Sequence, residues 1–213
     1  MLKYDLHTHT HYSKCSNMKP EVLLKTAKNR GMNGIAVTDH FAIEGALKVK
    51  QLNRDRNFEV IVGEEISTNY GDVLAYYVNE KIKTTDFFEA VDEIKKQNGL
   101  VIIPHPFRTS LNQNHHFKLP FDKIKNMVNA IEIFNSRMLR QRDNDRAKET
   151  AIKFGLAGTA GSDAHFKFEV AAGYTSFYGN LRKALKEKKT RAHGRIRFGA
   201  FAGLLSFLRV RLC

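Results

Sequence analysis

The residues best suited to chemistry stand near the start of the chain, where three histidines alternate in the segment YDLHTHTHYSKCS. His7 and His9 end an apolar run, and side chains two residues apart on a strand point to the same face. Two imidazoles on one face can bind one divalent ion, so this pair predicts two metal ligands. His11 would share the face only if the strand continued, and the polar residues after it favour a loop.

Donor side chains of the same kind recur after later apolar runs. They are Asp39 and His40, Glu64 and Glu65, His105, and Asp163 and His165. Parallel α/β proteins build their sites at the carboxyl ends of strands, so we expect these side chains to meet at one rim. Imidazoles and carboxylates together suit zinc, manganese or iron, and one carboxylate can bridge two ions.

The elements that must position these residues are short β-rich runs separated by longer segments with helical spacing. The predicted strands are Leu2–Leu6, Gly34–Val37, Glu59–Val62, Val73–Val78, Leu100–Ile103, Ala130–Phe134 and Leu156–Thr159. The predicted helices are Pro20–Arg30, Thr85–Gln97 and Asp143–Phe154, and Arg108–Asp122 is expected to form a long loop. The alternation predicts an α/β protein with a mainly parallel sheet. Periodicity alone leaves both a closed barrel and an open sheet possible.

Length and composition are those of an ordinary globular domain. The chain has 213 residues, of which 42% are hydrophobic and 27% charged. No apolar run approaches the ~20 residues that span a bilayer, and the first residues lack the apolar core of a signal peptide. The two cysteines, Cys15 and Cys213, form no disulfide framework. We therefore expect no transmembrane segment and a cytoplasmic location.

Positive charge is concentrated at the end of the chain. The net charge is +13, and residues 180–213 contain ten lysines and arginines against one glutamate. We expect a basic C-terminal tail (residues 180–213) after a domain of residues 1–179. Such a tail can be a solvated surface or can bind nucleic acid, and its segment FGAFAGLLSFLRVRL could instead dock on an anionic membrane surface.

Six segments in order resemble the motifs of the PHP (polymerase and histidinol phosphatase) family. They are DLHTHTHYS, GIAVTDH, GEEIST, IIPHPF, IEIFNSR and GTAGSDAH, and the resemblance covers roughly residues 2–178. It implies a distorted (β/α)7 barrel with two or three divalent ions (Mn, Zn or Fe) at its mouth. It also implies phosphoester hydrolysis by a metal-activated hydroxide.

The resemblance also implies a set of ligands. They are His7, His9, Glu65 and Asp163 for a first ion, Glu65 and His105 for a second, and Cys15, His40 and His165 for a third. Many members have Asp or His where Lys14 and Cys15 stand here. Many also have another histidine before the HP motif, where this chain offers only Asp72 as a substitute.

Further roles are expected for residues beside the ligands. Asp39, His40 and His165 are candidates for passing a proton to the leaving group. Arg108 and Arg137 are candidates for binding a substrate phosphate. Glu132 is expected to support the ligands, and Ser162 to orient the loop that carries Asp163. Three other histidines (His115, His116 and His193) are expected to lie outside the site.

The expected activity is that of a metal-dependent phosphoesterase, either a phosphatase or a nuclease. Its substrate would be a phosphorylated small molecule, a nucleotide or a nucleic acid. The alternative is a catalytically weak module that binds metal or nucleic acid and works through the basic tail. The oligomeric state is not predicted.

Overall fold

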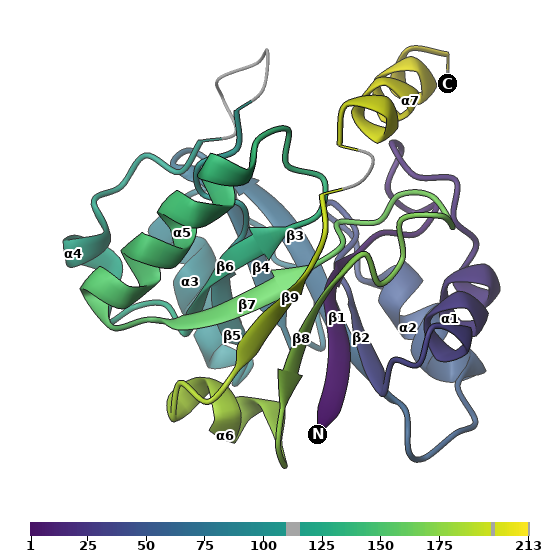
Figure 1. The fold of residues 1–213 in the computed structure, drawn as a ribbon, viewed down its shortest axis with the longest axis horizontal. Helices are drawn as coiled ribbons and strands as arrows, with labels where there is room; N and C mark the ends of the chain where they lie inside the picture. The colour runs from purple at the N-terminus through teal and green to yellow at the C-terminus, as the bar shows by residue number, and fades with distance from the viewer. Residues whose placement is uncertain (110–115, 197–198, 213) are drawn as a thin grey trace.

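The computed structural model describes residues 1–109, 116–196 and 199–212. Nine strands of this part of the chain form one sheet in the order β7-β6-β5-β4-β3-β2-β1-β8-β9 (Figure 1). The strands are β1 (Leu2–Thr8), β2 (Gly34–Val37), β3 (Glu59–Thr68), β4 (Gly71–Tyr76), β5 (Leu100–Ile103), β6 (Ala130–Asn135), β7 (Ala157–Gly161), β8 (Gly173–Phe177) and β9 (Arg191–Gly194). The helices are α1 (Pro20–Asn29), α2 (Glu44–Leu52), α3 (Phe87–Lys96), α4 (Phe121–Ile124), α5 (Gln141–Phe154), α6 (Leu181–Lys186) and α7 (Gly199–Leu212).

The sheet curls into a nearly closed barrel. An isolated parallel bridge joins Thr8, the last residue of β1, to Ala164, which follows β7. Parallel pairing of β1 with β2, β2 with β3, β5 with β6 and β6 with β7 turns most carboxyl ends toward one end of the barrel. The α/β class with a barrel-like sheet is therefore confirmed.

Alternation along the strands creates two apolar layers. In β2, Ile35 and Val37 pack outward against the helices, while Ala36 faces the inner cluster with Leu6 and Ile102. The inner cluster continues into Leu181, Ala184 and Leu185 of α6, which covers the amino-terminal end of the barrel (Figure 1). The opposite end is left to polar residues.

Local signals explain several helix ends. Pro20 begins α1, where its missing N–H costs no hydrogen bond. The Asp86 carboxylate accepts hydrogen bonds from the N–H groups of Phe88 and Glu89 and so caps α3. Gly155 ends α5 with a φ of +61°, a left-handed conformation that favours glycine.

The sheet departs from the expected (β/α)7 repeat at β3 and β4. These strands form an antiparallel hairpin with only Asn69 and Tyr70 between the paired residues Thr68 and Gly71, so no helix separates them. Gly71 has a φ of +122°, which allows this tight turn. β4 also runs antiparallel to β5, and β8 and β9 are additional strands antiparallel to their neighbours. Helices α2 and α6 were also not anticipated.

The segment predicted as a basic tail contributes to the fold. β9 pairs with β8, and Leu181 and Leu185 of α6 are buried in the inner cluster. The predicted boundary between residues 179 and 180 therefore does not separate the sheet from a tail. The end of the segment forms α7, which begins close to the backbone of Arg137 and Met138. None of the described helices combines the length and apolar character needed to cross a membrane.

The predicted loop Arg108–Asp122 is only partly described. Its residues 110–115, including His115, lie outside the described residues. Phe117 packs against Phe121, the first residue of α4, with ring centroids 5.5 Å apart. His116 lies beside the hairpin turn, because its carbonyl oxygen would be 3.2 Å from a Cβ placed on Gly71.

Candidate metal centre

The predicted ligands meet at the carboxyl-terminal end of the barrel. His7 lies in β1 and His9 follows it, His40 follows β2, and Glu65 lies in β3. The remaining ligands, His105, Asp163 and His165, follow β5 and β7. Segments distant in sequence are thus brought together by strand order alone, as the rim argument predicted.

Backbone geometry at this end is adapted to aim the side chains. His105 and Asp163 have positive φ angles of +27° and +55°, which non-glycine residues adopt at a cost. The N–H of Asp163 donates to the carbonyl of His7 at 2.7 Å. The Ser162 hydroxyl and N–H both donate to the buried Asp5 carboxylate, at 2.6 and 2.8 Å. These bonds tie the end of β7 to β1, in agreement with the role expected of Ser162.

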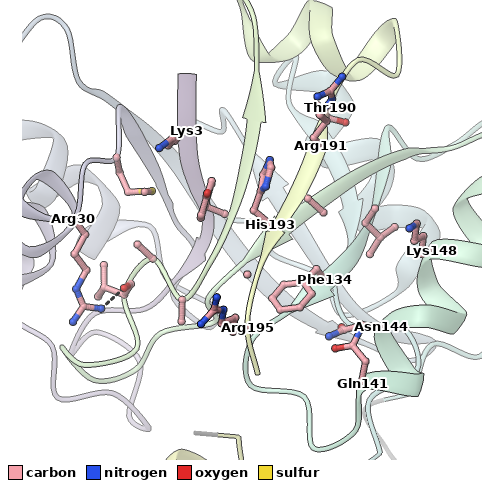
Figure 2. A pocket seen from close by; sticks show the side chains of 18 of the residues that line it. Lys3, Arg30, Phe134, Gln141, Asn144, Lys148, Thr190, Arg191, His193 and Arg195 are labelled. Carbon is pink, nitrogen blue, oxygen red and sulfur yellow. Dashed lines mark hydrogen bonds between the residues drawn. The ribbon is translucent and has the colours of Figure 1, made fainter. Parts of the chain in front are cut away.

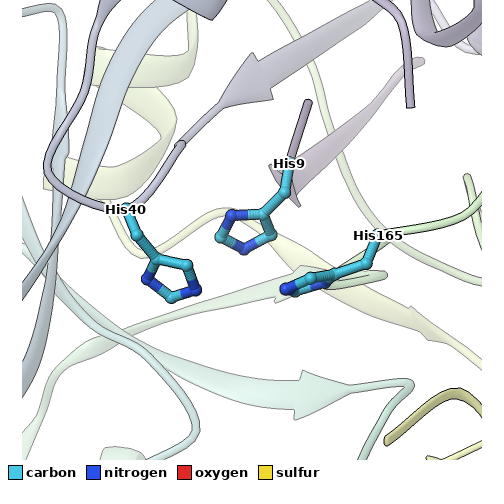
Figure 3. A group of neighbouring side chains, drawn as sticks. All are labelled: His9, His40 and His165. Atoms are coloured by element: carbon cyan, nitrogen blue, oxygen red, sulfur yellow. The ribbon is translucent and has the colours of Figure 1, made fainter. Parts of the chain in front are cut away.

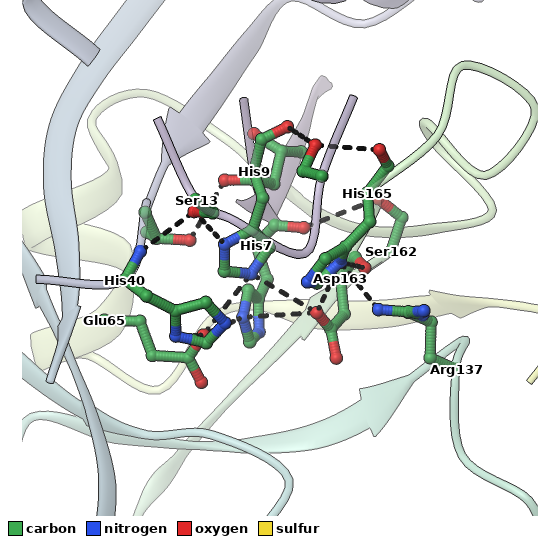
Figure 4. Close-up of polar contacts among 12 residues, drawn as sticks. His7, His9, Ser13, His40, Glu65, Arg137, Ser162, Asp163 and His165 are labelled. Carbon is green, nitrogen blue, oxygen red and sulfur yellow. Dashed lines mark hydrogen bonds and ion pairs between the residues drawn. The ribbon is translucent and has the colours of Figure 1, made fainter. Parts of the chain in front are cut away.

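Glu65 lies at the centre of the cluster (Figure 4). Its Oε2 is 3.3 Å from Nε2 of His7, from Nε2 of His9 and from Nδ1 of His40. Its Oε1 is 3.2 Å from Nε2 of His105. Glu65 therefore contacts imidazoles with both carboxylate oxygens, which is the arrangement of a carboxylate that bridges two ions.

Asp163 supplies the second carboxylate of the cluster. Its Oδ1 lies 3.3 Å from Nε2 of His9 and 3.7 Å from Nε2 of His7. Ligands about 2.1 Å from one tetrahedral ion lie about 3.4 Å apart, so these spacings fit donors that share an ion.

Unpartnered buried nitrogens also indicate a missing cation. Nε2 of His9 and Nδ1 of His105 are buried and have no hydrogen-bond partner in the protein. Such atoms are costly unless something binds them. Four overlapping groups of three donors among the described residues have ligand atoms that all lie within 4.8 Å of one another: His9–His40–His165, His7–His105–Asp163, His7–His9–Glu65 and Glu65–Asp72–His105. Imidazoles and carboxylates in this spacing fit zinc, manganese or iron.

The group of three histidines differs in one member from the predicted third site (Figure 3). The ring centroid of His9 is 4.7 Å from that of His40 and 4.2 Å from that of His165. Cys15, the predicted third member, joins none of the donor groups found in the described part of the chain. Burial, followed by the carboxylates of Asp163 and Glu65, raises the pKa of its thiol to about 12. This favours a protonated thiol near the cluster.

Asp72 takes the place suggested for it opposite His105. It lies in β4, is buried, and groups with Glu65 and His105. The Ser67 hydroxyl donates to its Oδ1 at 2.7 Å, which fixes the carboxylate. The antiparallel hairpin brings Asp72 to this position, because Ser67 and Asp72 are paired residues of β3 and β4.

Polar neighbours orient the ligands. Glu132 Oε1 lies 3.2 Å from Nδ1 of His7, which directs Nε2 into the cluster. Its Oε2 accepts hydrogen bonds from the N–H of His105 and from Nδ2 of Asn135, at 2.9 and 3.0 Å. The structure thus places Glu132 behind the ligands, where the sequence predicted it.

Asp39 holds the loop after β1. It accepts hydrogen bonds from the N–H and hydroxyl of Thr10 and from the hydroxyl of Ser13, at 2.6–2.7 Å. Ser13 Oγ in turn lies 3.3 Å from Nδ1 of His9 and accepts from the N–H of His40. Asp39 therefore fixes the ring of His9 through Ser13.

Electrostatics within the cluster favour mixed charges. Burial alone would lower the pKa of His7, but the carboxylates of Asp163, Glu132 and Glu65 outweigh it and raise that pKa well above its ordinary value. Burial would raise the pKa of Glu65, but His40 and His7 hold it well below its usual range. Burial, Arg137 and His9 push the pKa of His165 well below its usual range. The two carboxylates are thus ionised, as metal ligands must be.

The two candidate arginines differ in their surroundings. Arg108 is partly exposed, and its Nη1 lies 3.6 Å from Oδ2 of Asp163 at the edge of the cluster. Arg137 is 5% exposed, with Nη1 2.6 Å from Nδ1 of His165 and Nη2 donating to the hydroxyl of Ser206 in α7 at 2.9 Å. Its Nε lies 3.0 Å from Oε1 of Glu169.

The sequence did not single out two residues that support the site. Glu169 accepts hydrogen bonds from the N–H groups of His165 and Phe166, at 2.9 and 3.0 Å, and so shapes the turn after β7. Nδ2 of Asn135 lies 3.3 Å from Oδ2 of Asp163. Only their positions near GSDAH and IEIFN hinted at such roles. His11 is exposed and stacks on Tyr12, and His193 lies on β9, away from the cluster.

A barrel-like α/β fold whose strand ends gather buried imidazoles and carboxylates defines the class of metal-dependent barrel proteins. The PHP domain family matches residues 5–187 of the chain. An uncharacterised protein of Methanocaldococcus jannaschii is 35% identical over 181 residues, which cover 83% of this chain and 70% of that protein. The chain belongs to the PHP domain family, whose structural relatives include PHP-like metal-dependent phosphoesterases.

Two solved structures share the fold. One is a two-domain protein from Bacteroides vulgatus, described as containing a predicted PHP-like metal-dependent phosphoesterase. It has a TM-score of 0.78 and 19% identity, over 91% of this chain and 65% of that protein's length. The other is PsfC from Pseudomonas syringae, with a TM-score of 0.71 and 18% identity, over 100% of this chain and 99% of the other. At these identities the likeness shows the fold alone.

Proposed function

We propose that the protein hydrolyses phosphoester bonds with divalent metal ions held by the cluster around Glu65. The observation that carries the proposal is the contact of both Glu65 oxygens with four imidazoles, beside buried nitrogens that have no partner. When bound, such ions activate water and neutralise charge on a phosphoryl group.

The chain's own residues divide the binding task. We assign His7, His9, Glu65 and Asp163 to one ion, and Glu65, His105 and Asp72 to a second. His40 and His165 complete a third group with His9, and Nε2 of His9 can serve only one ion at a time. Two ions are therefore the smaller complement that uses the donors around Glu65, and a third requires either a rearranged His9 or another donor such as Cys15.

We assign proton transfer to His40. Asp39 is engaged by three hydrogen bonds, and His165 is enclosed by Arg137 and by the carbonyl of Asp163. The side chain of His40 is 35% exposed, so it can exchange a proton with solvent. With ions held only around Glu65, His40 stays available to protonate the leaving oxygen.

We assign phosphate binding to Arg108. Its guanidinium is partly exposed beside Asp163, so it can also reach a bound phosphate. Arg137 is instead engaged with His165, Glu169 and Ser206, and we assign it to positioning His165. The substrate is then a phosphomonoester, a nucleotide or a nucleic-acid strand.

The test is phosphate release by protein reconstituted separately with Mn²⁺ and Zn²⁺. The substrates are an aryl phosphate, nucleoside mono- and bisphosphates, and a short 5′-phosphorylated RNA. We expect release from at least one substrate, its loss on chelation, and its loss together with bound metal in the variant His7→Ala/His9→Ala. Full activity in that variant contradicts the mechanism. Bound metal without release from any substrate favours the alternative of a module that only binds.

A further inference from the structure

A second candidate site lies outside the metal centre, along both sides of β9 (Figure 2). It is an open groove of about 1360 Å³, and none of the assigned metal ligands lines it. Its walls come from β1, β8, β9, α5 and the turn after α1. The proposed hydrolysis does not use this groove.

The groove is strongly basic. Its cationic side chains are Lys3, Arg30, Lys148, Arg191 and Arg195, and Asp145 is the single acidic residue among its lining residues. Arg30 donates to the carbonyls of Phe168 and Val170 and keeps its charge at the wall. Within the described residues, the other four form no ion pair with a carboxylate. The positive charge is therefore available to an anionic ligand.

Strand geometry arranges these charges in a row beside an aromatic pair. Arg191, His193 and Arg195 alternate along β9 and its extension, where the N–H of Arg195 donates to the carbonyl of Ala172. Alternate residues share a face of the sheet. His193 pairs across the ladder with Tyr174, and their rings stack with centroids 4.9 Å apart and planes 12° apart. The Ser176 hydroxyl, 2.7 Å from Nε2 of His193, holds the imidazole in place.

We propose that this groove binds single-stranded nucleic acid, with Lys3, Arg191 and Arg195 contacting phosphates and the Tyr174–His193 pair offering a stacking surface. A row of cations beside aromatic rings is how proteins hold single strands without reading sequence. The volume exceeds the ~300–1,000 Å³ of ordinary small-molecule pockets and suits an extended ligand. Lys3 and Arg30 come from the start of the chain, so the surface is not a property of the C-terminal segment.

The proposal goes beyond the proposed function and does not depend on it. Residues 166–172 separate the groove from the metal centre: Phe168 and Val170 line the groove, while Glu169 faces Arg137 and His165. Binding in the groove can therefore be measured whether or not the metal centre cleaves anything.

The test is binding of a labelled 12-nucleotide single-stranded RNA to the full chain, followed by fluorescence anisotropy in EDTA over a series of salt concentrations. In the variant Arg191→Gln/Arg195→Gln, we expect at least tenfold weaker binding. The plot of log affinity against log salt should flatten by about 1.4, the slope of two lost phosphate contacts on a single strand. The control Lys95→Gln/Lys96→Gln removes two exposed charges at the end of α3 and should bind as the unaltered protein does.

A second variant tests the stacking surface. Tyr174→Leu keeps an apolar side chain on β8 and removes the ring, so RNA binding should weaken at least about fivefold. Binding of inorganic polyphosphate, which has charge but no bases, should not change in Tyr174→Leu. Unchanged melting temperatures show that the variants are folded. No RNA binding, or equal RNA binding by the Arg191→Gln/Arg195→Gln variant and its control, overturns the proposal. An RNA affinity insensitive to Tyr174→Leu reduces the groove to a general polyanion surface and overturns the assignment to nucleic acid.

Discussion

Two adjacent glutamates show how a single residue's orientation decides its chemistry. Glu65 points into the cluster and contacts four imidazoles, whereas Glu64 points to the other face of β3. There the N–H of Ile82 donates to Glu64 Oε2 at 2.9 Å, and Oε1 is buried without a partner. Burial raises the pKa of Glu64 from 4.5 to about 7, opposite in direction to the pKa of Glu65.

This raised pKa predicts how stability depends on pH. The folded protein holds the Glu64 proton more tightly than the unfolded chain does, so this group's contribution to the free energy of unfolding falls as pH rises from about 4.5 to about 7. Relative to the unaltered protein, Glu64→Gln should therefore gain stability between pH 5 and pH 8, by up to ~3 kcal/mol. Urea unfolding at the two pH values measures the gain. The exposed change Glu149→Gln should show none, and an equal difference at both pH values would contradict the prediction.

A second residue-scale prediction concerns Asp72. If it completes the site with Glu65 and His105, Asp72→Asn should lower the metal content by about one ion per chain, because an amide oxygen is a weaker ligand than a carboxylate. Asn can still accept the hydrogen bond from Ser67, so folding should be retained. Elemental analysis after reconstitution with Mn²⁺ and dialysis gives the content. Asp92→Asn, an exposed change on α3, is the control, and an unaltered content in Asp72→Asn would exclude this ligand.

At this scale, residue types and spacing in the sequence indicated which side chains gather, because strand ends share a rim. The sequence could not show that His9, rather than Cys15, groups with His40 and His165, since ring orientation depends on the loop held by Asp39. Nor could it show that Arg137 is turned toward Glu169 and Ser206, because Ser206 lies 69 residues away in sequence.

At the scale of elements, the placement of α7 is the least foreseeable feature. Its sequence suggested an amphipathic or irregular segment, yet the helix stands at the same end of the barrel as the metal centre (Figure 1). Ala202 is fully buried, Ser206 accepts from Arg137, and Nε of Arg209 donates to the carbonyl of Ser16 at 3.1 Å. Only contacts remote in sequence hold α7, so periodicity could not place it. β8 and β9 escaped prediction because GYTSF and RAHG are short and carry few β-branched residues.

Two glycines of α7 provide a matched test of this docking. A Cβ on Gly199 would lie 2.6 Å from the carbonyl oxygen of Met138 and 2.7 Å from that of Arg137, whereas a Cβ on Gly203 would meet nothing within 4 Å. Gly199→Ala should therefore loosen α7, and limited proteolysis should release the helix several-fold faster. Gly203→Ala should leave proteolysis unchanged or slow it, since alanine favours helix by ~1 kcal/mol. Equal rates for the two variants would show that α7 is not held at its first residue.

For the molecule as a whole, the metal centre is a cost of folding that a cation can remove. The barrel buries four imidazoles, His7, His9, His105 and His165, together with the carboxylates of Glu65 and Asp163. Desolvating such groups is unfavourable, and the attraction between them offsets this only in part. Two apolar clusters, one inside the barrel and one beneath the helices, supply the stability that tolerates the arrangement.

Metal binding should therefore stabilise the entire fold. A ligand that binds only the folded state at 100 times its Kd adds about 2.7 kcal/mol, which for a chain of this size raises Tm by roughly 5–10 °C. Thermal unfolding of chelated protein with added Zn²⁺ or Mn²⁺ should show this rise, and His7→Ala/His9→Ala should abolish it. His11→Ala should keep the full rise, because His11 is exposed and stacks on Tyr12 outside the cluster. A rise of equal size in His7→Ala/His9→Ala would place the stabilising ion elsewhere on the protein. A rise confined to proteins with the intact cluster would show that the donors around Glu65 are linked to the stability of the whole barrel.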